Sequence, residues 1–194
     1  MRNSGEFYIF AFMLNIIHLS HRKDRERLLI EQLKDQNIVD YKLWEGVFDK
    51  ENPKCGIARA HKNIVRWAQS QNHPFVLIAE DDIKFTAIGA FEYFIKNEPK
   101  EYDLYLGGVM HGEINEDHSI NDFSGLTLYK IRENFYDTFL SLSEERDIDR
   151  ELANKGKFIV CNPFTVVQHN GFSDNKNEYQ NFDLYLQQHK LFGQ

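Results

Sequence analysis

The 194-residue sequence predicts an α/β domain in which a mainly parallel sheet is covered by helices on both faces. Three observations lead to this fold class. Short apolar segments alternate with longer amphipathic ones through the first half of the chain, a pattern typical of parallel sheets. The length suits a single domain with a substantial core. The apolar run 75–79 ends in Glu80, Asp81 and Asp82, as expected where a buried strand reaches the ligand-binding edge of such a sheet.

The first half of the chain contains the clearest alternation. Its apolar segments predict strands over residues 14–19, 41–47, 75–79 and 102–106. The segments between them predict helices over residues 24–36, 57–72 and 88–95. In the first helix Leu29 and Leu33 lie one turn apart, and Asp24 is a suitable N-terminal cap.

The second half is less regular. Residues 111–124 are polar and predict a surface loop, and residues 169–174 predict another. Strands are expected over residues 126–131, 158–161 and 164–168, and helices over residues 134–142 and 147–154.

Composition excludes several classes of function. A formal net charge of −7 argues against a general nucleic-acid-binding protein, because the phosphate backbone would be repelled. Cys55 and Cys161 are too few for a disulfide scaffold and match no zinc-binding spacing. We therefore expect a reduced, cytoplasmic environment.

The N-terminus begins with the apolar stretch 7–17. This stretch is shorter than the roughly 20 residues that a transmembrane helix needs, and it has no cleavage site typical of a secretory signal. Met13 could be an alternative start. We therefore expect residues 1–12 to be an N-terminal extension and residues 13–194 to form one domain.

The acidic triplet is the strongest functional signal from the residues themselves. Side chains alternate along a strand, so Glu80 and Asp82 are expected on one face and Asp81 on the other. Two converging carboxylates suit a hard divalent cation, which in turn often holds a phosphate. The alternative is a turn in which an Asp caps a helix starting at residues 83–85.

Four segments carry motifs in a characteristic order. Residues 17–25 read IHLSHRKDR, residues 56–67 contain Ala60-His61 ahead of a tryptophan, and residues 76–82 end an apolar strand in the triplet. Asp147-Ile148-Asp149 then precedes residues 163–174, which end in Gly-Phe-Ser-Asp. Together they resemble glycosyltransferase family 25, which includes lipooligosaccharide glycosyltransferases and procollagen galactosyltransferases. Two positions depart from the family pattern: His18 replaces Asn, and Ala60 replaces Ser.

The resemblance implies a GT-A-like, Rossmann-type fold, a nucleotide-sugar donor, a divalent metal ion (Mn or Mg) and transfer with inversion. It implies that Glu80 and Asp82 bind the metal, with His169 completing the shell, although Gln168 fits the family pattern better than His169 does. The positions that it implies for donor binding are Leu19, Ser20, Arg22, Asp24, Gly56, His61, Lys62, Asp81 and Gln168.

Individual roles follow for some of these residues, each with an alternative. Arg22 is expected to pair with the diphosphate near a helix N-terminus, oriented by Asp24, whereas Arg25 is expected to be an ordinary surface charge. His61 either contacts the donor or is a satisfied core residue. Asp149 is expected to be the base that deprotonates the acceptor, the alternative being a helix cap.

The activity that we expect is transfer of a hexose, such as galactose, from a UDP-sugar to a saccharide acceptor. That acceptor would belong to a surface glycan or lipooligosaccharide and could be lipid-linked, which would place the enzyme in the cytoplasm or at the inner face of a membrane. Hydroxylysine in collagen-like protein is a less favoured acceptor. Two rival interpretations are a catalytically silent nucleotide-sugar-binding module and a magnesium-dependent nucleotidyl or phosphoryl transferase.

Overall fold

The computed structural model describes residues 13–182 and 189–194. Its centre is a seven-stranded sheet with the order β2-β1-β3-β9-β5-β10-β7. These strands are β1 (Leu14–His18), β2 (Tyr41–Glu45), β3 (Phe75–Glu80), β5 (Leu104–Leu106), β7 (Ser119–Ile120), β9 (Leu128–Arg132) and β10 (Phe158–Val160). Only β9 and β7 run against the other five strands of this sheet, so the prediction of a mainly parallel sheet is confirmed.

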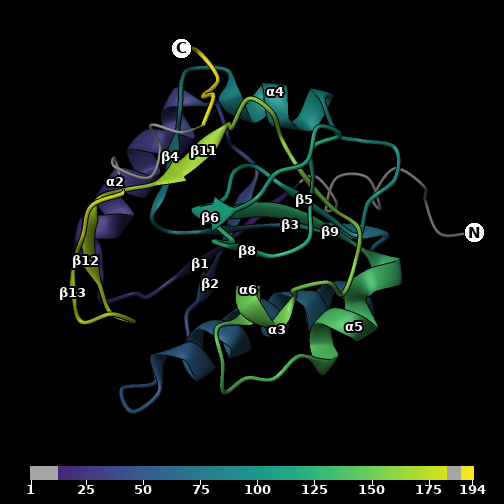
Figure 1. Ribbon diagram of the computed structural model, residues 1–194. Helices are drawn as coiled ribbons and strands as arrows, with labels where there is room; N and C mark the ends of the chain where they lie inside the picture. The colour runs from purple at the N-terminus through teal and green to yellow at the C-terminus, as the bar shows by residue number, and fades with distance from the viewer. Residues whose placement is uncertain (1–12, 183–188) are drawn as a thin grey trace, which may run out of the picture.

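Helices cover both faces of the sheet (Figure 1). One face packs against α2 (Lys23–Asp35) and α4 (Ala90–Lys96), and the other against α3 (Pro53–Ser70), α5 (Tyr136–Ser141) and α6 (Ile148–Glu151). The turn η1 (Glu133–Phe135) leads into α5. This three-layer arrangement is the single-domain α/β fold, with helices on both faces of a mainly parallel sheet, that the sequence predicts.

Strand β3 shows how the sheet divides the core into two layers. Val76 and Ile78 belong to the buried cluster on the α3 side, and Leu77 and Ala79 to the cluster on the α2 side. A strand covered on both faces needs apolar side chains at every position. This requirement explains the unbroken apolar run that ends at the acidic triplet.

Three short antiparallel ribbons lie outside the main sheet. They are β4 (Ile83–Phe85) with β11 (Val166–Gln168), β6 (His111–Gly112) with β8 (Phe123–Ser124), and β12 (Gly171–Ser173) with β13 (Glu178–Gln180). The helix considered for residues 83–85 is therefore wrong, because this segment pairs with a strand about 80 residues later. The loops expected at residues 111–124 and 169–174 also contain strands, too short for an alternation of apolar and polar residues to reveal them.

Helix boundaries differ from the predicted ones for identifiable reasons. Helix α3 starts at Pro53 rather than near residue 57, and proline is favoured in the first turn because its missing N–H is not needed there. Helix α2 starts at Lys23 without a side-chain cap, since Asp24 binds Arg22 instead. In the part of the chain that the structure describes, no helix is long and apolar enough to cross a membrane. The expected extension, residues 1–12, lies outside the described residues.

The α4 layer gives a test of core packing. Phe94 is fully buried, and its ring stacks on Tyr105 with centroids 4.4 Å apart. We expect Phe94→Ala to lower the free energy of unfolding by about 3–5 kcal/mol, because it removes the stacked ring and leaves a cavity. Urea denaturation would measure this loss. Ile88→Ala is the control, since Ile88 is 80% exposed and its loss should cost about 0.5 kcal/mol or less. Similar losses in both variants would contradict the packing described.

Candidate functional site

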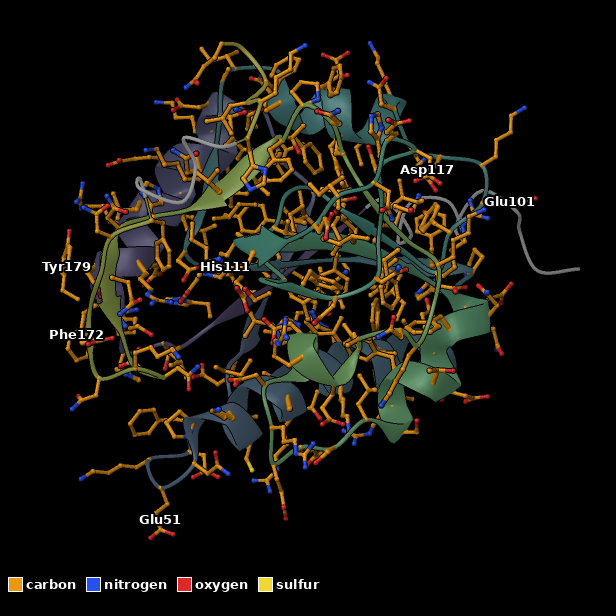
Figure 2. All side chains as sticks on the ribbon, in the orientation of Figure 1. Glu51, Glu101, His111, Asp117, Phe172 and Tyr179 are labelled. Carbon is orange, nitrogen blue, oxygen red and sulfur yellow. The ribbon has the colours of Figure 1, made fainter. Side chains whose placement is uncertain are left out.

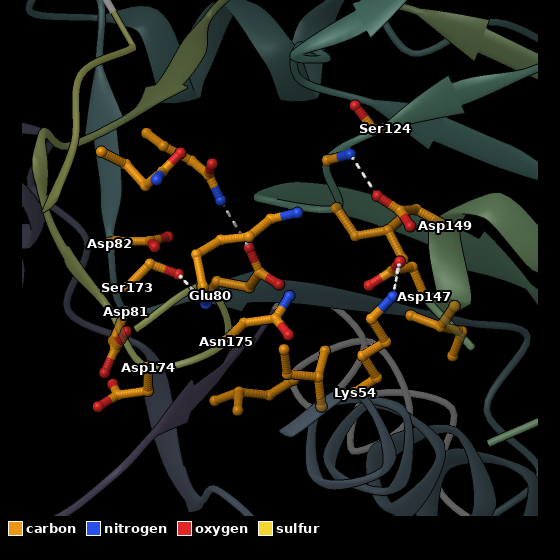
Figure 3. A pocket seen from close by; sticks show the side chains of 18 of the residues that line it. Lys54, Glu80, Asp81, Asp82, Ser124, Asp147, Asp149, Ser173, Asp174 and Asn175 are labelled. Carbon is orange, nitrogen blue, oxygen red and sulfur yellow. Dashed lines mark hydrogen bonds and ion pairs between the residues drawn. The ribbon is translucent and has the colours of Figure 1, made fainter. Parts of the chain in front are cut away.

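A cavity of about 540 Å³ lies at the carboxyl ends of β1, β2 and β3. Its walls come from the segments that follow these strands, the first half of α3, the β8–β9 connection, the start of α6 and the β12–β13 hairpin. All three acids of the triplet line it. Figure 3 shows Glu80 between Asp82 on one side and Asp147 and Asp149 on the other. The cavity therefore lies where ligands bind in open α/β sheets.

Glu80 is held by side chains from two other elements. One carboxylate oxygen lies 3.2 Å from His61 Nε2 on α3, and the other accepts a hydrogen bond of 3.1 Å from Gln168 Nε2 on β11. His61 is only 1% exposed, and its Nδ1 lies 2.9 Å from the hydroxyl of buried Tyr129. His61 is thus a buried, hydrogen-bonded residue that also lines the cavity, and its contact with a donor stays a prediction.

Asp81 faces β1 and α2. One of its oxygens lies 2.8 Å from His18 Nδ1, and the other accepts a hydrogen bond of 2.8 Å from Arg25 Nη1. Burial opposes ionisation, but the bonds to His18 and Arg25 outweigh it and lower the pKa of Asp81. The Asp81 side chain is only 7% exposed, so this acid is buried and paired rather than solvated.

Asp82 is the least satisfied of the three acids. Burial raises its pKa to about 7, against the opposing charge of Arg25, whose Nη1 lies 3.3 Å from Asp82 Oδ2. Within the part of the chain that the structure describes, Asp82 Oδ1 is buried without a hydrogen-bond partner, and so is His169 Nε2. The backbone N–H of His169 donates to the carbonyl of Asp82 at 2.7 Å, which makes the two residues cross-strand neighbours beyond the β4–β11 ribbon.

The expected pairing of Glu80 with Asp82 does not occur. Glu80 turns to His61 and Gln168, whereas Asp82 lies near Arg25 and next to His169. The chain enters a turn directly after Glu80, so the strand alternation that predicted a shared face does not continue. Among residues 13–182 and 189–194, no three or more His, Cys, Asp and Glu side chains lie close enough to hold a metal ion.

Arginines at the start of α2 tie the β12–β13 hairpin to the body of the protein. Arg22 binds Asp24 through two hydrogen bonds, of 3.0 and 2.8 Å, and also pairs with Asp174 on the hairpin. Arg22 and Arg25 both donate to the carbonyl of Phe172, at 3.2 and 3.1 Å. The outer side of the hairpin presents the exposed cross-strand pair Phe172 and Tyr179 (Figure 2).

This arrangement corrects the roles expected for the two arginines. Arg22 is oriented by Asp24 as expected, but it is 9% exposed, is occupied by two carboxylates and does not line the cavity. Arg25 is instead the arginine that lines the cavity, and burial leaves its side chain only 21% exposed. Arg22 is the non-helical N-cap residue of α2, whereas Arg25 lies in the first turn of the helix, so helical spacing does not set their relative directions.

Asp149 lies on the opposite wall, in the first turn of α6. Its two oxygens accept backbone N–H groups of Gly125 and Arg150, each at 2.8 Å. Burial raises the pKa of Asp149 despite these bonds, and the charges of Glu80 and Asp147 add to the effect. Gly125 adopts φ +99°, a conformation that favours glycine. The helix-cap position itself belongs to Asp147, without a side-chain capping bond.

Most of the residues expected at the site do line the cavity. They are Leu19, Gly56, His61, Glu80, Asp81, Asp82, Asp149, Gln168 and His169. Four do not: Ser20, Arg22, Asp24 and Lys62. Lys62 points to the far side of α3, where its ammonium group donates to the Leu142 carbonyl at 2.5 Å, so a contact of this side chain with the donor is not supported. Ser20 is exposed, and its backbone N–H donates to Glu45.

Three further residues at the site were not identified from the sequence. Lys54 lines the cavity and binds Asp147 at 2.6 Å, Asp174 belongs to the hairpin wall, and Tyr129 supports His61 from behind. No sequence motif marks Lys54 or Tyr129. Asp174 belongs to the Gly-Phe-Ser-Asp ending, which could have indicated it.

Comparisons with known proteins bear on the fold. No family model matches the sequence, and no curated protein matches it significantly. Among solved structures, A197 from STIV is 12% identical with a TM-score of 0.52, over 87% of this chain and 94% of that chain. HddC from Yersinia pseudotuberculosis is 15% identical with a TM-score of 0.48, over 81% of this chain and 73% of that chain. A glycosyltransferase involved in the glycosylation of the major capsid of PBCV-1 is 10% identical with a TM-score of 0.46, over 78% of this chain and 82% of that chain. At such identities a likeness shows the fold alone, and the match to A197 shows it here.

The raised pKa of Asp82 gives a pH-dependent prediction. Between about pH 4 and pH 7 the folded state retains a proton that the unfolded state has released, so stability should fall as the pH rises through this window. Asp82→Asn carries no charge. We expect it to be more stable than the wild type by about 1–3 kcal/mol at pH 8 and equally stable near pH 4.

Chemical denaturation at both pH values would measure this difference. Glu116→Gln removes an exposed carboxylate elsewhere and should leave the stability nearly unchanged at each pH. An equal effect of Asp82→Asn at the two pH values would show that the charge of Asp82 is not the cause.

Proposed function

We propose that this chain is an inverting glycosyltransferase that uses a nucleotide-sugar donor. The observation that carries the proposal is the placement of two different carboxylates on opposite walls of one cavity (Figure 3). Asp82 offers an oxygen without a partner, and Asp149 has a raised pKa. The first suits the binding of a phosphate-bearing donor through a cation, and the second suits proton removal from an acceptor.

Asp149 is the proposed base. It takes the proton of an acceptor hydroxyl while that oxygen attacks the anomeric carbon of the donor sugar. The bond between that carbon and the diphosphate oxygen breaks, and the nucleoside diphosphate leaves with the electron pair. Attack from the Asp149 side, opposite the triplet, inverts the configuration. A raised pKa favours this role because it makes the carboxylate a better proton acceptor.

A divalent cation such as Mn or Mg is part of the proposal. Asp82 Oδ1 and His169 Nε2 are the groups that fit it, because both are buried and neither has a partner among the described residues. The oxygens of Glu80 are engaged by His61 and Gln168. When bound, the cation would neutralise the departing diphosphate. Magnesium-like ions are often held by one or two protein groups plus substrate phosphates. We therefore propose that metal and donor bind together.

The proposed donor is a UDP-linked hexose such as galactose, and the proposed acceptor is a saccharide, either free or lipid-linked. The cavity volume of about 540 Å³ is within the range of small-molecule sites. Leu19, Gly46, Val47 and Gly56 also line the cavity, and the proposal places the nucleoside against them. A Cβ added at Gly56 would lie 2.2 Å from the Val47 carbonyl, so glycine lets this wall close.

A thermal-shift panel tests donor and metal together. With UDP-galactose, UDP-glucose and UDP-N-acetylglucosamine, each with and without MnCl₂, we expect one sugar nucleotide to raise the melting temperature only when manganese is present. Asp82→Asn should remove the manganese dependence while melting no lower than the wild type without ligand. Manganese-dependent stabilisation that survives in this variant would contradict the role of Asp82. Turnover of a nucleoside triphosphate without any sugar donor would favour a nucleotidyl or phosphoryl transferase instead.

Asp149→Asn tests the proposed base. We expect the rate of transfer to a saccharide acceptor to fall by about 10²–10⁴-fold, with donor affinity within about twofold of the wild type, because only proton removal is lost. Single-turnover kinetics would measure the rate of transfer, and calorimetry would measure the affinity for the donor. Asp147→Asn is the matched control, since Lys54 binds this carboxylate two residues away, and it should lose less than about tenfold. Equal losses in the two variants would argue against Asp149 as the base.

A further inference from the structure

A chain of hydrogen-bonding groups runs from the core to Glu80. Tyr129 on β9 is fully buried, and its hydroxyl lies 2.9 Å from His61 Nδ1. His61 Nε2 lies 3.2 Å from Glu80 Oε1, and Gln168 donates to Glu80 Oε2 at 3.1 Å. The three supporting residues come from α3, β9 and β11, so Glu80 is fixed from separate parts of the fold.

The direction of each hydrogen bond follows from the chemistry of the groups. An ionised carboxylate only accepts, so His61 Nε2 must carry the proton that it shares with Glu80. Nδ1 can then accept from Tyr129, and burial raises the pKa of Tyr129, which keeps its hydroxyl protonated as the donor. Each group in the chain is therefore satisfied in one arrangement, which also fixes the orientation of the imidazole ring.

Glu80 keeps unused acceptor capacity. Its two oxygens offer about four lone-pair sites, and among the residues that the structure describes His61 and Gln168 occupy two of them. The remaining sites belong to a side chain that lines the cavity and is 22% exposed. Glu80 lies between Asp82 and Asp149 (Figure 3), and its charge contributes to the raised pKa of Asp149. This is the part of the cavity where the transferred sugar would lie between diphosphate and acceptor.

We propose that His61 is a positioning residue, which holds Glu80 so that its carboxylate accepts hydrogen bonds from hydroxyl groups of the donor sugar. Tyr129 orients His61, and Gln168 binds the other oxygen of Glu80. Sugar hydroxyls are neutral donors that match the free lone pairs of a fixed carboxylate. This inference rests on the proposed function and deepens it. It separates the triplet into a hydroxyl-binding acid, Glu80, and a cation-binding acid, Asp82.

Calorimetric titration with UDP-galactose and, separately, with UDP tests this division, each in MnCl₂. We expect His61→Leu to weaken UDP-galactose binding at least tenfold and UDP binding less than twofold, because only the sugar contact is lost. Tyr129→Phe, which deletes a single oxygen and keeps the ring in the core, should weaken UDP-galactose binding about threefold. His61→Gln should recover most of the affinity, since its amide can donate to Glu80. Asn63→Ala, on the exposed side of α3, is the matched control.

Each other outcome has a definite meaning. Equal weakening of UDP and UDP-galactose, or no weakening in His61→Leu and Tyr129→Phe, would overturn the positioning role while leaving the proposed function intact. Wild-type protein that binds UDP-galactose no more tightly than UDP would also overturn the positioning role and leave the proposed function intact, because Glu80 would then not bind the sugar. Binding of neither ligand by wild-type protein would overturn the UDP-sugar donor and this inference with it. Melting temperatures of the variants would show that each is folded.

Discussion

The architecture of the cavity depends on one constraint: three adjacent carboxylates follow a strand that is buried on both faces. Unpaired charge is costly in such a place, so neighbouring elements must supply hydrogen-bond donors. Helix α2 supplies Arg25 to Asp81, and helix α3 supplies His61 to Glu80. Of the three acids, Asp82 alone has a buried oxygen with no hydrogen-bond partner in the described part of the chain. The elements around the sheet edge thus meet at the triplet. The missing hydrogen-bond partner of Asp82 is what makes this edge suited to a ligand.

The sequence was sufficient to predict the architecture wherever local pattern reflects burial. The run from Phe75 to Ala79 is apolar because both sides of β3 are covered, and this signal needs no knowledge of the partner strands. The segment Ile83–Phe85 shows where such reasoning ends. It is a strand only because Val166–Gln168 pairs with it. A three-residue segment carries too little periodicity to reveal a partner about 80 residues away.

The composition of the site was also predictable from the sequence, but its pairings were not. The motif residues gather at one edge because parallel strands bring their ends together. Which arginine faces the cavity depends on how the chain enters α2, because Arg22 is the non-helical N-cap residue and Arg25 lies in the first turn. The partners of Glu80 depend on how closely α3 and β11 approach β3 in three dimensions. Spacing along the chain gives no information about such distances.

The reversed direction of β9 has a consequence for the ligand edge. The five mutually parallel strands end at this edge, so each of them places the residues that follow it here. Strand β9 enters the sheet here instead, between β3 and β5, and the residues that precede it arrive at the same place. The backbone amide of Gly125 reaches Asp149 by this route. Because β9 is antiparallel to its neighbours, the main-chain segment that precedes it lies beside the carboxylates at this edge of the sheet. The N–H groups of that segment can bind these carboxylates as fixed, uncharged donors.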